Sequence, residues 1–348
     1  MSLGAAAMMA ESKEPRFDPV AYSRWRHENA PLRLRFNAKT PAQVKSWQRK
    51  LRSKLEELVG GFPAVKAPLD ARILESKEVD GFTREKIVFT SREGMEVLGY
   101  LVKPKNGGSA PLPVMVCVPG HGIGVEDLLT NPDGYMHAYA LQAASQGVAA
   151  FAIEPLAFGH RRDPINAKRG PNANSCQPAA GAALLFGETM IGWRVYDVMR
   201  TIDYIETRKD LNAKRVGCMG ISGGGTCTLF AAALDERIQA ALVSGYLCSF
   251  KECILSLAHC MDNYVPGILN WAEMSDVASL IAPRALFAET GEKDRIFPVQ
   301  GFKDAFAEVK KAYEVAGVPD RIGSAIHSGE HVFDGREGLP FVIGKLKA

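Results

Sequence analysis

The chain has 348 residues, of which 47% are hydrophobic, and its formal net charge is +3. This length and apolar content suffice for one large domain with a sizeable buried core. The nearly balanced charge and the 8% aromatic content, with no basic block interleaved with aromatic residues, argue against nucleic-acid binding. No apolar run reaches the roughly 18 residues that would indicate a membrane span.

Residues 1–17 are expected to form a disordered or cloning-derived tail, because its small, apolar start, Met1–Ala10, lacks the basic start and the full apolar segment of an export signal. The alternative is the remnant of a removed signal, so we expect a soluble protein that is either cytoplasmic or exported. A helical appendage is predicted over residues 18–65. Within it, Ala42–Leu55 carries apolar residues at helical spacing, and Thr40 is the candidate N-cap.

Residues 66–348 are predicted to form an α/β domain with a mostly parallel central sheet flanked by helices. Residues 84–90 and 95–102 have the pattern of an antiparallel hairpin with a turn near Gly94. From residue 114 onward, apolar strand-like runs alternate with helical stretches, as βαβ units require. The sequence leaves the oligomeric state open.

The most specific motif is Gly220–Gly224, which has the form G-x-S-x-G and stands between a strand-like run and a small-residue helix start. In a nucleophile elbow of this form, the serine occupies a strained strand-to-helix turn that exposes its hydroxyl at the top of the sheet. Ser222 is therefore the candidate nucleophile, and the Gly223 amide is the first candidate donor to an oxyanion. The motif alone also fits a glycine-rich turn with an ordinary serine.

A serine nucleophile needs a base and an acid that orients the base, and candidates for both follow downstream. Asp294, just after a strand-like run, is the predicted acid, with Glu289 and Glu292 as rivals and helix capping as its alternative role. His331, in a loop before the last helix, is the predicted base, and His327 at the preceding strand end is its competitor. The order Ser, Asp, His along the chain is that of α/β-hydrolases.

A second oxyanion donor is expected in the glycine-rich segment Gly120–Gly124, which follows the apolar run Val114–Val118. We assign this donor to the Ile123 amide, with the Gly122 amide as the alternative, and expect His121 to orient the loop. A plain glycine turn is the alternative interpretation.

Two insertions, residues 156–187 and a cap-like segment over residues 246–274, are expected above the carboxyl end of the sheet, where specificity is usually determined. Three aromatic residues are candidates for a platform that stacks on a sugar, unless they only pack the core: Trp193, Tyr246 and Trp271. Together with His121 they are the candidate substrate contacts. Three arginines of the first insertion could meet an acidic substrate or simply be solvated: Arg161, Arg162 and Arg169.

The seven cysteines, an odd number, do not suggest a disulfide framework. Cys248, Cys253 and Cys260 lie close enough in the chain for one local disulfide. Their spacing matches no zinc pattern, so we predict neither a metal nor a cofactor.

These motifs resemble those of the acetyl xylan esterase-like branch of the α/β-hydrolases related to dienelactone hydrolase. The resemblance covers about residues 70–348 and is carried by five segments: Val118–Gly122, Gly192–Asp197, Gly217–Gly225, Asn263–Ile268 and Leu280–Arg284. It implies an α/β-hydrolase fold, a triad of Ser222, Asp294 and His331, and the hydrolysis of esters, often those of acylated carbohydrates.

The sequence thus predicts a cofactor-free serine carboxylesterase that acts through an acyl-enzyme, with a small-molecule or carbohydrate ester as substrate and deacetylation as the expected reaction. A lactone hydrolase or peptidase of the same fold is one alternative, and a catalytically silent binding module is another. The acyl and alcohol groups of the substrate do not follow from the sequence.

Overall fold

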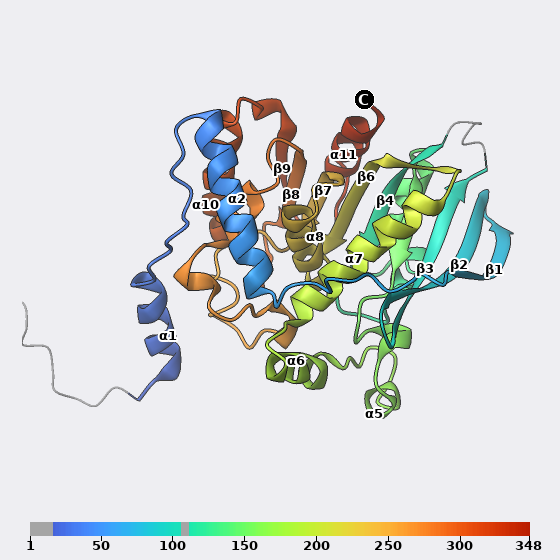
Figure 1. Ribbon diagram of the computed structural model, residues 1–348, viewed down its shortest axis with the longest axis horizontal. Coiled ribbons are helices and arrows are strands. Elements are labelled where there is room, and N and C mark those ends of the chain that lie inside the picture. Colours follow the sequence, from blue (N-terminus) through green and yellow to red (C-terminus); the bar gives the residue numbers. More distant parts are fainter. Residues whose placement is uncertain (1–16, 106–110) are drawn as a thin grey trace, which may run out of the picture.

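In a computed structural model of the protein, which describes residues 17–105 and 111–348, a nine-stranded sheet lies between two layers of helices (Figure 1). The strands are β1 (Arg72–Val79), β2 (Phe82–Arg92), β3 (Met95–Pro104), β4 (Leu112–Val118), β5 (Ala149–Ile153), β6 (Leu211–Ile221), β7 (Ile238–Ser244), β8 (Ala285–Gly291) and β9 (Ile322–His327). Their order across the sheet is β1-β2-β3-β5-β4-β6-β7-β8-β9. The first four strands of this order pair antiparallel, and all pairs from β5 to β9 are parallel. Except for Phe17, the predicted tail lies outside the described residues.

The central strands are apolar on both faces, and every residue of β5 and β8 is buried. This is the pattern expected of parallel strands covered by helices on both sides. The predicted hairpin is present as β2 and β3. Strand β1 was not predicted, because all but one of its residues are exposed and it lacks a clear apolar alternation. Its charged side chains suit an edge strand, since they discourage pairing with other chains.

Helices cover both faces of the sheet. One face carries α2 (Pro41–Leu58), α7 (Met190–Thr207), α8 (Gly223–Leu234), α9 (Met274–Ser279) and α10 (Val299–Val315), and the other carries α3 (Asp127–Thr130), α4 (Tyr139–Ser145) and α11 (Gly338–Lys347). The remaining helices are α1 (Pro19–Glu28), α5 (Pro164–Ala167) and α6 (Cys176–Leu185), with the short 3-10 helices η1 (Gly159–Arg161), η2 (Met261–Asn263), η3 (Ile268–Asn270) and η4 (Pro319–Arg321). In the described ranges, no helix is both long and apolar enough to cross a bilayer.

Helix α2 is part of the main body. Thr40 caps it, as predicted, by accepting a hydrogen bond from the Gln43 amide at 3.3 Å. Trp47 and Leu55 are buried in the same hydrophobic cluster as residues of α7 and α8. The segment predicted as an appendage over 18–65 therefore packs against the sheet domain through α2, whereas α1 has no buried residue.

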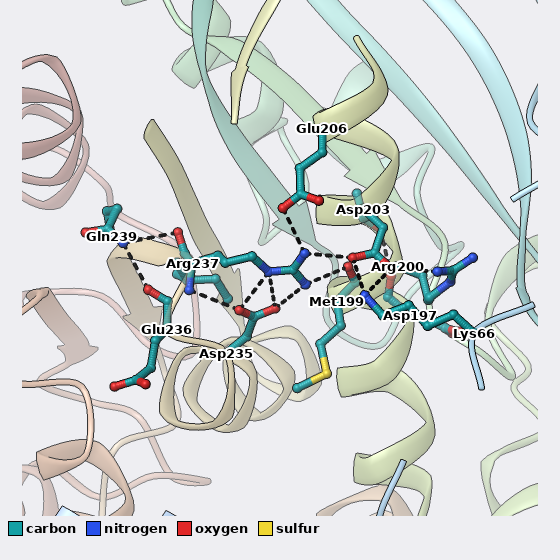
Figure 2. A network of polar contacts seen from close by, with 12 residues as sticks. Lys66, Asp197, Met199, Arg200, Asp203, Glu206, Asp235, Glu236, Arg237 and Gln239 are labelled. Carbon is teal, nitrogen blue, oxygen red and sulfur yellow. Dashed lines mark hydrogen bonds and ion pairs between the residues drawn. The ribbon is translucent and has the colours of Figure 1, made fainter. Parts of the chain in front are cut away.

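The carboxyl-terminal half of α7 is held by a partly buried network of ion pairs (Figure 2). The Asp203 carboxylate is bound by Lys66 at 2.9 Å, Arg200 at 2.6 Å and Arg237 at 2.7 Å. Arg237 also pairs with Asp235 at 2.6 Å within the turn after α8, so its contact with Asp203 joins this turn to α7. Because every charge in the network has a partner of opposite sign, it fixes one helix against the other without leaving an uncompensated buried charge.

The two insertions lie at one edge of the sheet, beyond the carboxyl ends of the parallel strands, which is the lower edge in Figure 1. The first, residues 156–187, was expected as a long loop and contains η1, α5 and α6. The second, residues 246–274, contains η2 and η3. Helix α6 packs against η2, so the two insertions contact each other beyond the carboxyl ends of the strands.

Candidate active site

Ser222 lies where β6 ends and α8 begins, with φ 59° and ψ −124°. Positive φ is uncommon for a residue other than glycine, and it is the conformation that a nucleophile elbow imposes on its serine. The tight turn requires Gly224, because a Cβ atom there would lie 1.8 Å from the Val118 carbonyl oxygen. The Ser222 amide donates a hydrogen bond to the Ser244 carbonyl at 3.1 Å, which ties the turn to β7. The sequence motif thus folds as the strand, turn and helix that its form predicts.

The predicted acid and base lie together. His331 Nδ1 donates a hydrogen bond to Asp294 Oδ2 at 2.7 Å. The other oxygen, Asp294 Oδ1, accepts hydrogen bonds from the Ile296 and Phe297 amides at 2.8 and 3.0 Å. Burial opposes ionisation of Asp294, but the hydrogen bond from His331 and these amides lower its pKa below the ordinary value. One oxygen therefore organises the turn before α10, and the other orients the histidine.

The His331 ring is held on several sides. It stacks between Tyr135 and Phe297, with centroid distances of 5.9 and 5.7 Å. Behind it lies Gly245, where a Cβ atom would be 2.9 Å from His331 Cε1. The Nε2 atom is buried and makes no hydrogen bond within the described chain. The ring is therefore fixed through Nδ1 and has its second nitrogen available.

The alternative candidates for the acid and the base, Glu289, Glu292 and His327, lie away from the pocket. The buried Glu289 carboxylate accepts a hydrogen bond from the Asp334 amide at 3.0 Å, and burial raises its pKa. Glu292 is exposed. His327 Nδ1 accepts a hydrogen bond from a backbone amide at 3.2 Å, and burial lowers its pKa. None of the three borders the pocket that contains Ser222.

Ser222 and His331 border a pocket of about 430 Å³. Its other lining residues are His121, Tyr135, Gly223, Leu257, Ala258, His259, Cys260, Asn263, Ile296 and Phe297. No lysine, arginine, aspartate or glutamate is among these described lining residues. The pocket therefore offers imidazole, amide, hydroxyl and apolar groups to a ligand, and no permanently charged side chain.

The loop after β4 differs from its prediction in one respect. The Ile123 amide donates a hydrogen bond to Asp127 Oδ2 at 2.9 Å. It is therefore occupied, and the assignment of the second oxyanion donor to Ile123 is wrong. A Cβ atom on Gly122 would lie 2.3 Å from the same carboxylate oxygen.

The part of this loop next to Ser222 is Gly120 and His121. A Cβ atom on Gly120 would lie 3.2 Å from Ser222 Cβ, and the His121 ring lies 3.2 Å from the position of a Cβ atom on Gly223. The Tyr135 hydroxyl donates a hydrogen bond to the His121 carbonyl at 2.7 Å and so fixes this peptide. His121 therefore lies beside the elbow, and its role in orienting the loop stays a prediction.

Residues 27–333 of the chain match the Abhydrolase family. The chain belongs to this family. It is similar to YtaP of Bacillus subtilis strain 168, a candidate hydrolase, with 27% identity over 77% of this chain and 89% of YtaP. At the level of the family, this match confirms the resemblance to acetyl xylan esterase-like α/β-hydrolases that was found in the sequence.

Two solved structures share the fold of this Abhydrolase-family chain. The first is BF1801 of Bacteroides fragilis NCTC 9343, a candidate acetyl xylan esterase, with a TM-score of 0.83, 18% identity and 97% of each chain covered. The second is a glucuronoyl esterase of Solibacter usitatus, with a TM-score of 0.65 and 18% identity over 86% of this chain and 93% of that one. At these identities the likeness establishes the α/β-hydrolase fold.

The aromatic platform predicted for this Abhydrolase-family member does not form. Tyr246 is completely buried. The Trp193 indole N–H donates to the Glu188 carboxylate, and Lys54 lies 4.5 Å from the centre of the Trp271 ring. None of the three aromatic residues borders the pocket. Helical spacing and loop position gave no information about which way each ring would face.

The predicted contacts of the first insertion with an acidic substrate are not supported either. Arg161 pairs with the buried Asp197 at 2.7 Å, and Arg162 donates to the Gly170 carbonyl at 2.6 Å. Arg169 is exposed and does not border the pocket. The cysteines are all free, so the local disulfide considered for the second insertion is not formed.

Two residues that line the pocket, Tyr135 and His259, could not be recognised as such from the sequence. Tyr135 links the His331 ring to the His121 carbonyl, as described above. His259 packs on Phe297 at a centroid distance of 5.4 Å, and its Nε2 is buried without a hydrogen bond in the described chain. Burial lowers the pKa of His259, so the ring is neutral near pH 7 and can form a hydrogen bond with a ligand.

Sequence reasoning also missed a buried polar cluster beside the pocket. Asp262 forms an ion pair with Arg194 of α7, and its Oδ2 lies 3.5 Å from His121 Nε2. Cys176 and Cys260 contribute their thiols to the same cluster. Burial opposes the charge on Asp262, but Arg194 and His121 lower the pKa of its carboxyl group. A hydrogen bond from Cys260 and the charge of Arg194 lower the pKa of the Cys176 thiol. Both Asp262 and Arg194 lie in or next to segments that carried the family resemblance.

Proposed function

We propose that the protein is a serine carboxylesterase that acts through an acyl-enzyme. The observation that carries the proposal is the 2.7 Å hydrogen bond between His331 and Asp294 at the pocket that also contains Ser222 in its elbow turn. A base that is oriented through one ring nitrogen and free at the other can activate a serine hydroxyl. The elbow serine, the base and its orienting carboxylate come from three loops at one edge of the sheet.

In the proposed reaction, the Ser222 hydroxyl attacks the ester carbonyl while His331 Nε2 takes its proton. The C–O bond to the alcohol then breaks, and His331 returns the proton to the departing alcohol. A water molecule next gives its proton to His331 and attacks the acyl-enzyme, which releases the acid and restores the Ser222 hydroxyl. Asp294 stays ionised throughout and stabilises the His331 imidazolium.

The oxyanion formed in each half of the reaction needs two donors. We assign them to the Gly223 amide, at the first residue of α8, and to the His121 amide. Support comes from the close packing of Gly120 on Ser222 and of the His121 ring on Gly223. The amino terminus of α8 adds its dipole to the stabilisation of negative charge at this point.

The proposed substrate is a neutral ester with a small acyl group, such as an acetylated carbohydrate. The absence of charged side chains among the described lining residues favours a neutral ligand. The ring of His259, which lines the pocket, suits a substrate hydroxyl group. Relatives of the same fold are described as acetyl xylan and glucuronoyl esterases, which agrees with carbohydrate esters as substrates.

The proposal is tested with aryl esters of increasing acyl length and with acetylated xylan, using the wild type, Ser222→Ala and Ser145→Ala. Ser145 is an exposed serine on α4 and serves as the matched control. We expect kcat to fall on the order of 10⁴-fold or more in Ser222→Ala and to be unchanged in Ser145→Ala. A fluorophosphonate should label Ser222 alone. Turnover of lactones but of no open-chain ester would favour the lactone hydrolase, and absence of both labelling and turnover would favour a binding module.

A further inference from the structure

The buried cluster beside the pocket gathers four metal-binding side chains from three separate parts of the chain. His121 comes from the loop after β4, Cys176 from the first turn of α6 in the first insertion, and Cys260 and Asp262 from the second insertion. One ligand atom from each of the four lies within 4.8 Å of the others. No such convergence is needed for the ester chemistry proposed above.

The three distances among the ligand atoms of His121, Cys176 and Asp262 match a tetrahedral zinc site. His121 Nε2 lies 3.5 Å from Asp262 Oδ2, and Cys176 Sγ lies 3.8 Å from each of these two atoms. With Zn–S bonds of about 2.3 Å and Zn–N or Zn–O bonds of about 2.0–2.2 Å, tetrahedral ligand atoms are about 3.3–3.8 Å apart. The three atoms therefore already stand at the separations that an ion between them requires.

The charges around the cluster balance when a divalent cation is added. Two thiolates and the Asp262 carboxylate carry three negative charges, which one zinc ion and the Arg194 guanidinium neutralise. Arg194 is buried, donates to the Leu156 carbonyl at 2.8 Å, and contacts Asp262 and, at 3.3 Å, Cys176 Sγ. An arginine that contacts ligands from outside the coordination sphere fixes their orientation and lowers the cost of collecting negative charge.

We propose that His121, Cys176, Cys260 and Asp262 bind one zinc ion with a structural role. Four protein ligands would fill the tetrahedral positions, so no position is left for a catalytic water. The expectation of no metal came from the spacing of neighbouring cysteines, whereas these ligands are brought together only by the fold. The His121 ring is 31% exposed and Cys260 borders the pocket, which gives an ion a route in from that side.

A metal ion at this site would hold separate segments of the chain together. It would join both insertions to the loop that carries the proposed oxyanion donor, and it would hold the His121 ring against Gly223. Zinc binding does not depend on the esterase proposal, because Ser222 is not a ligand. Ser222→Ala should therefore bind zinc as the wild type does, which separates the failure of one proposal from that of the other.

The test uses the full-length protein purified under reducing conditions, with zinc content measured by mass spectrometry. We expect one zinc per chain, and in the cobalt-substituted protein a thiolate-to-cobalt charge-transfer band and visible bands of tetrahedral cobalt. Cys260→Ser should lower zinc affinity at least tenfold. Cys253→Ser is the matched control, because Cys253 lies in the same insertion and its thiol donates to the Ser249 carbonyl instead. Its zinc affinity should be unchanged.

A second measurement keeps the proposal testable if Cys260→Ser does not fold. The folded wild type is treated with an alkylating reagent with and without added zinc, and modified cysteines are identified by peptide mass spectrometry. Zinc should protect Cys176 and Cys260 and leave the alkylation of the other five cysteines unchanged. The proposal is overturned if zinc does not bind or protects neither thiol, or if Cys176 and Cys260 form a disulfide in the protein purified under reducing conditions.

Discussion

Two histidines that line the pocket of Ser222, His331 and His121, each face a buried aspartate, and the two carboxylates differ in what else they bind. Asp294 receives His331 at 2.7 Å and otherwise accepts only backbone amides, with no cationic side chain in contact. Asp262 lies 3.5 Å from His121 and forms an ion pair with Arg194. The negative charge of Asp294 therefore acts mainly on His331, whereas the charge of Asp262 is already neutralised by Arg194. The same two residue types thus suit a proton transfer in one place and a rigid support in the other.

The largest effect that separates the two pairs is expected from Asp294→Asn. The amide oxygen can still accept the turn hydrogen bonds, but the variant cannot stabilise the His331 imidazolium. We expect kcat/KM for an aryl acetate to fall about 10³- to 10⁴-fold, with the melting temperature nearly unchanged. Steady-state kinetics and thermal unfolding check this result. A loss of less than tenfold in a folded variant would remove Asp294 from the triad.

Asp262→Asn should act in the opposite way, on stability more than on turnover. It leaves the Arg194 guanidinium buried without its carboxylate partner, and breaking a buried ion pair in this way costs about 3–5 kcal/mol. Denaturant unfolding of the metal-free protein measures this loss, and kcat of the folded fraction should fall much less than in Asp294→Asn. Equal losses of turnover in the two variants would show that the pairs do not have separate roles.

A third buried carboxylate, that of Glu154, sharpens the comparison, because within the described chain it contacts neither a histidine ring nor a cationic side chain. Glu154 accepts hydrogen bonds from the Val125 and His160 amides at 3.0 and 3.3 Å. Burial raises its pKa from 4.5 to about 7. Since the folded protein favours the protonated form, the stability that this group contributes is fully present below about pH 4.5 and is lost as the pH rises towards 7.

Glu154→Gln should therefore flatten the pH dependence of the unfolding free energy. Between pH 5 and pH 8, we expect the wild type to lose about 2 kcal/mol more than the variant. Urea unfolding at several pH values measures the difference between the two proteins, so other titrating groups cancel. A variant whose stability runs parallel to that of the wild type across this range would contradict the raised pKa.

The smallest of these effects is expected from Gly245→Ala, which tests the position of the His331 ring. The new methyl group would meet His331 Cε1 at 2.9 Å, and a small displacement of a catalytic base costs roughly 10- to 100-fold in kcat. Gly81→Ala is the matched control, since Gly81 has φ +84° and nothing within 4 Å of the added atom. Both variants carry the same kind of backbone strain, and only Gly245→Ala should lose turnover.

The sequence predicted the central sheet and the neighbourhood of Ser222, Asp294 and His331 because these depend on local patterns. Continuous apolar runs mark buried parallel strands, and the elbow and the strand-end loops follow them in a fixed order. Strand β1 escaped prediction because its exposed, charged residues show no clear apolar face.

The rest of the site depends on individual side-chain contacts, some local and some between distant segments, that apolar periodicity does not reveal. Asp127 is four residues beyond Ile123 and takes the amide that had been assigned to the oxyanion, which a glycine-rich pattern cannot reveal. His121, Cys176 and Asp262 meet only after both insertions fold over the sheet. The orientation of the Trp193 ring is set locally, by its contact with Glu188 five residues earlier in the chain. Spacing along the chain carries no information about such encounters.

The backbone of Ser222 has a consequence for how the family changes over time. A residue other than glycine held at φ 59° and ψ −124° costs on the order of 1–3 kcal/mol. Glycine would relieve that cost, so Ser222→Gly should raise stability while it removes the proposed nucleophile. Selection for stability alone would favour this exchange, so the strain at Ser222 is worth keeping only where its hydroxyl contributes to function.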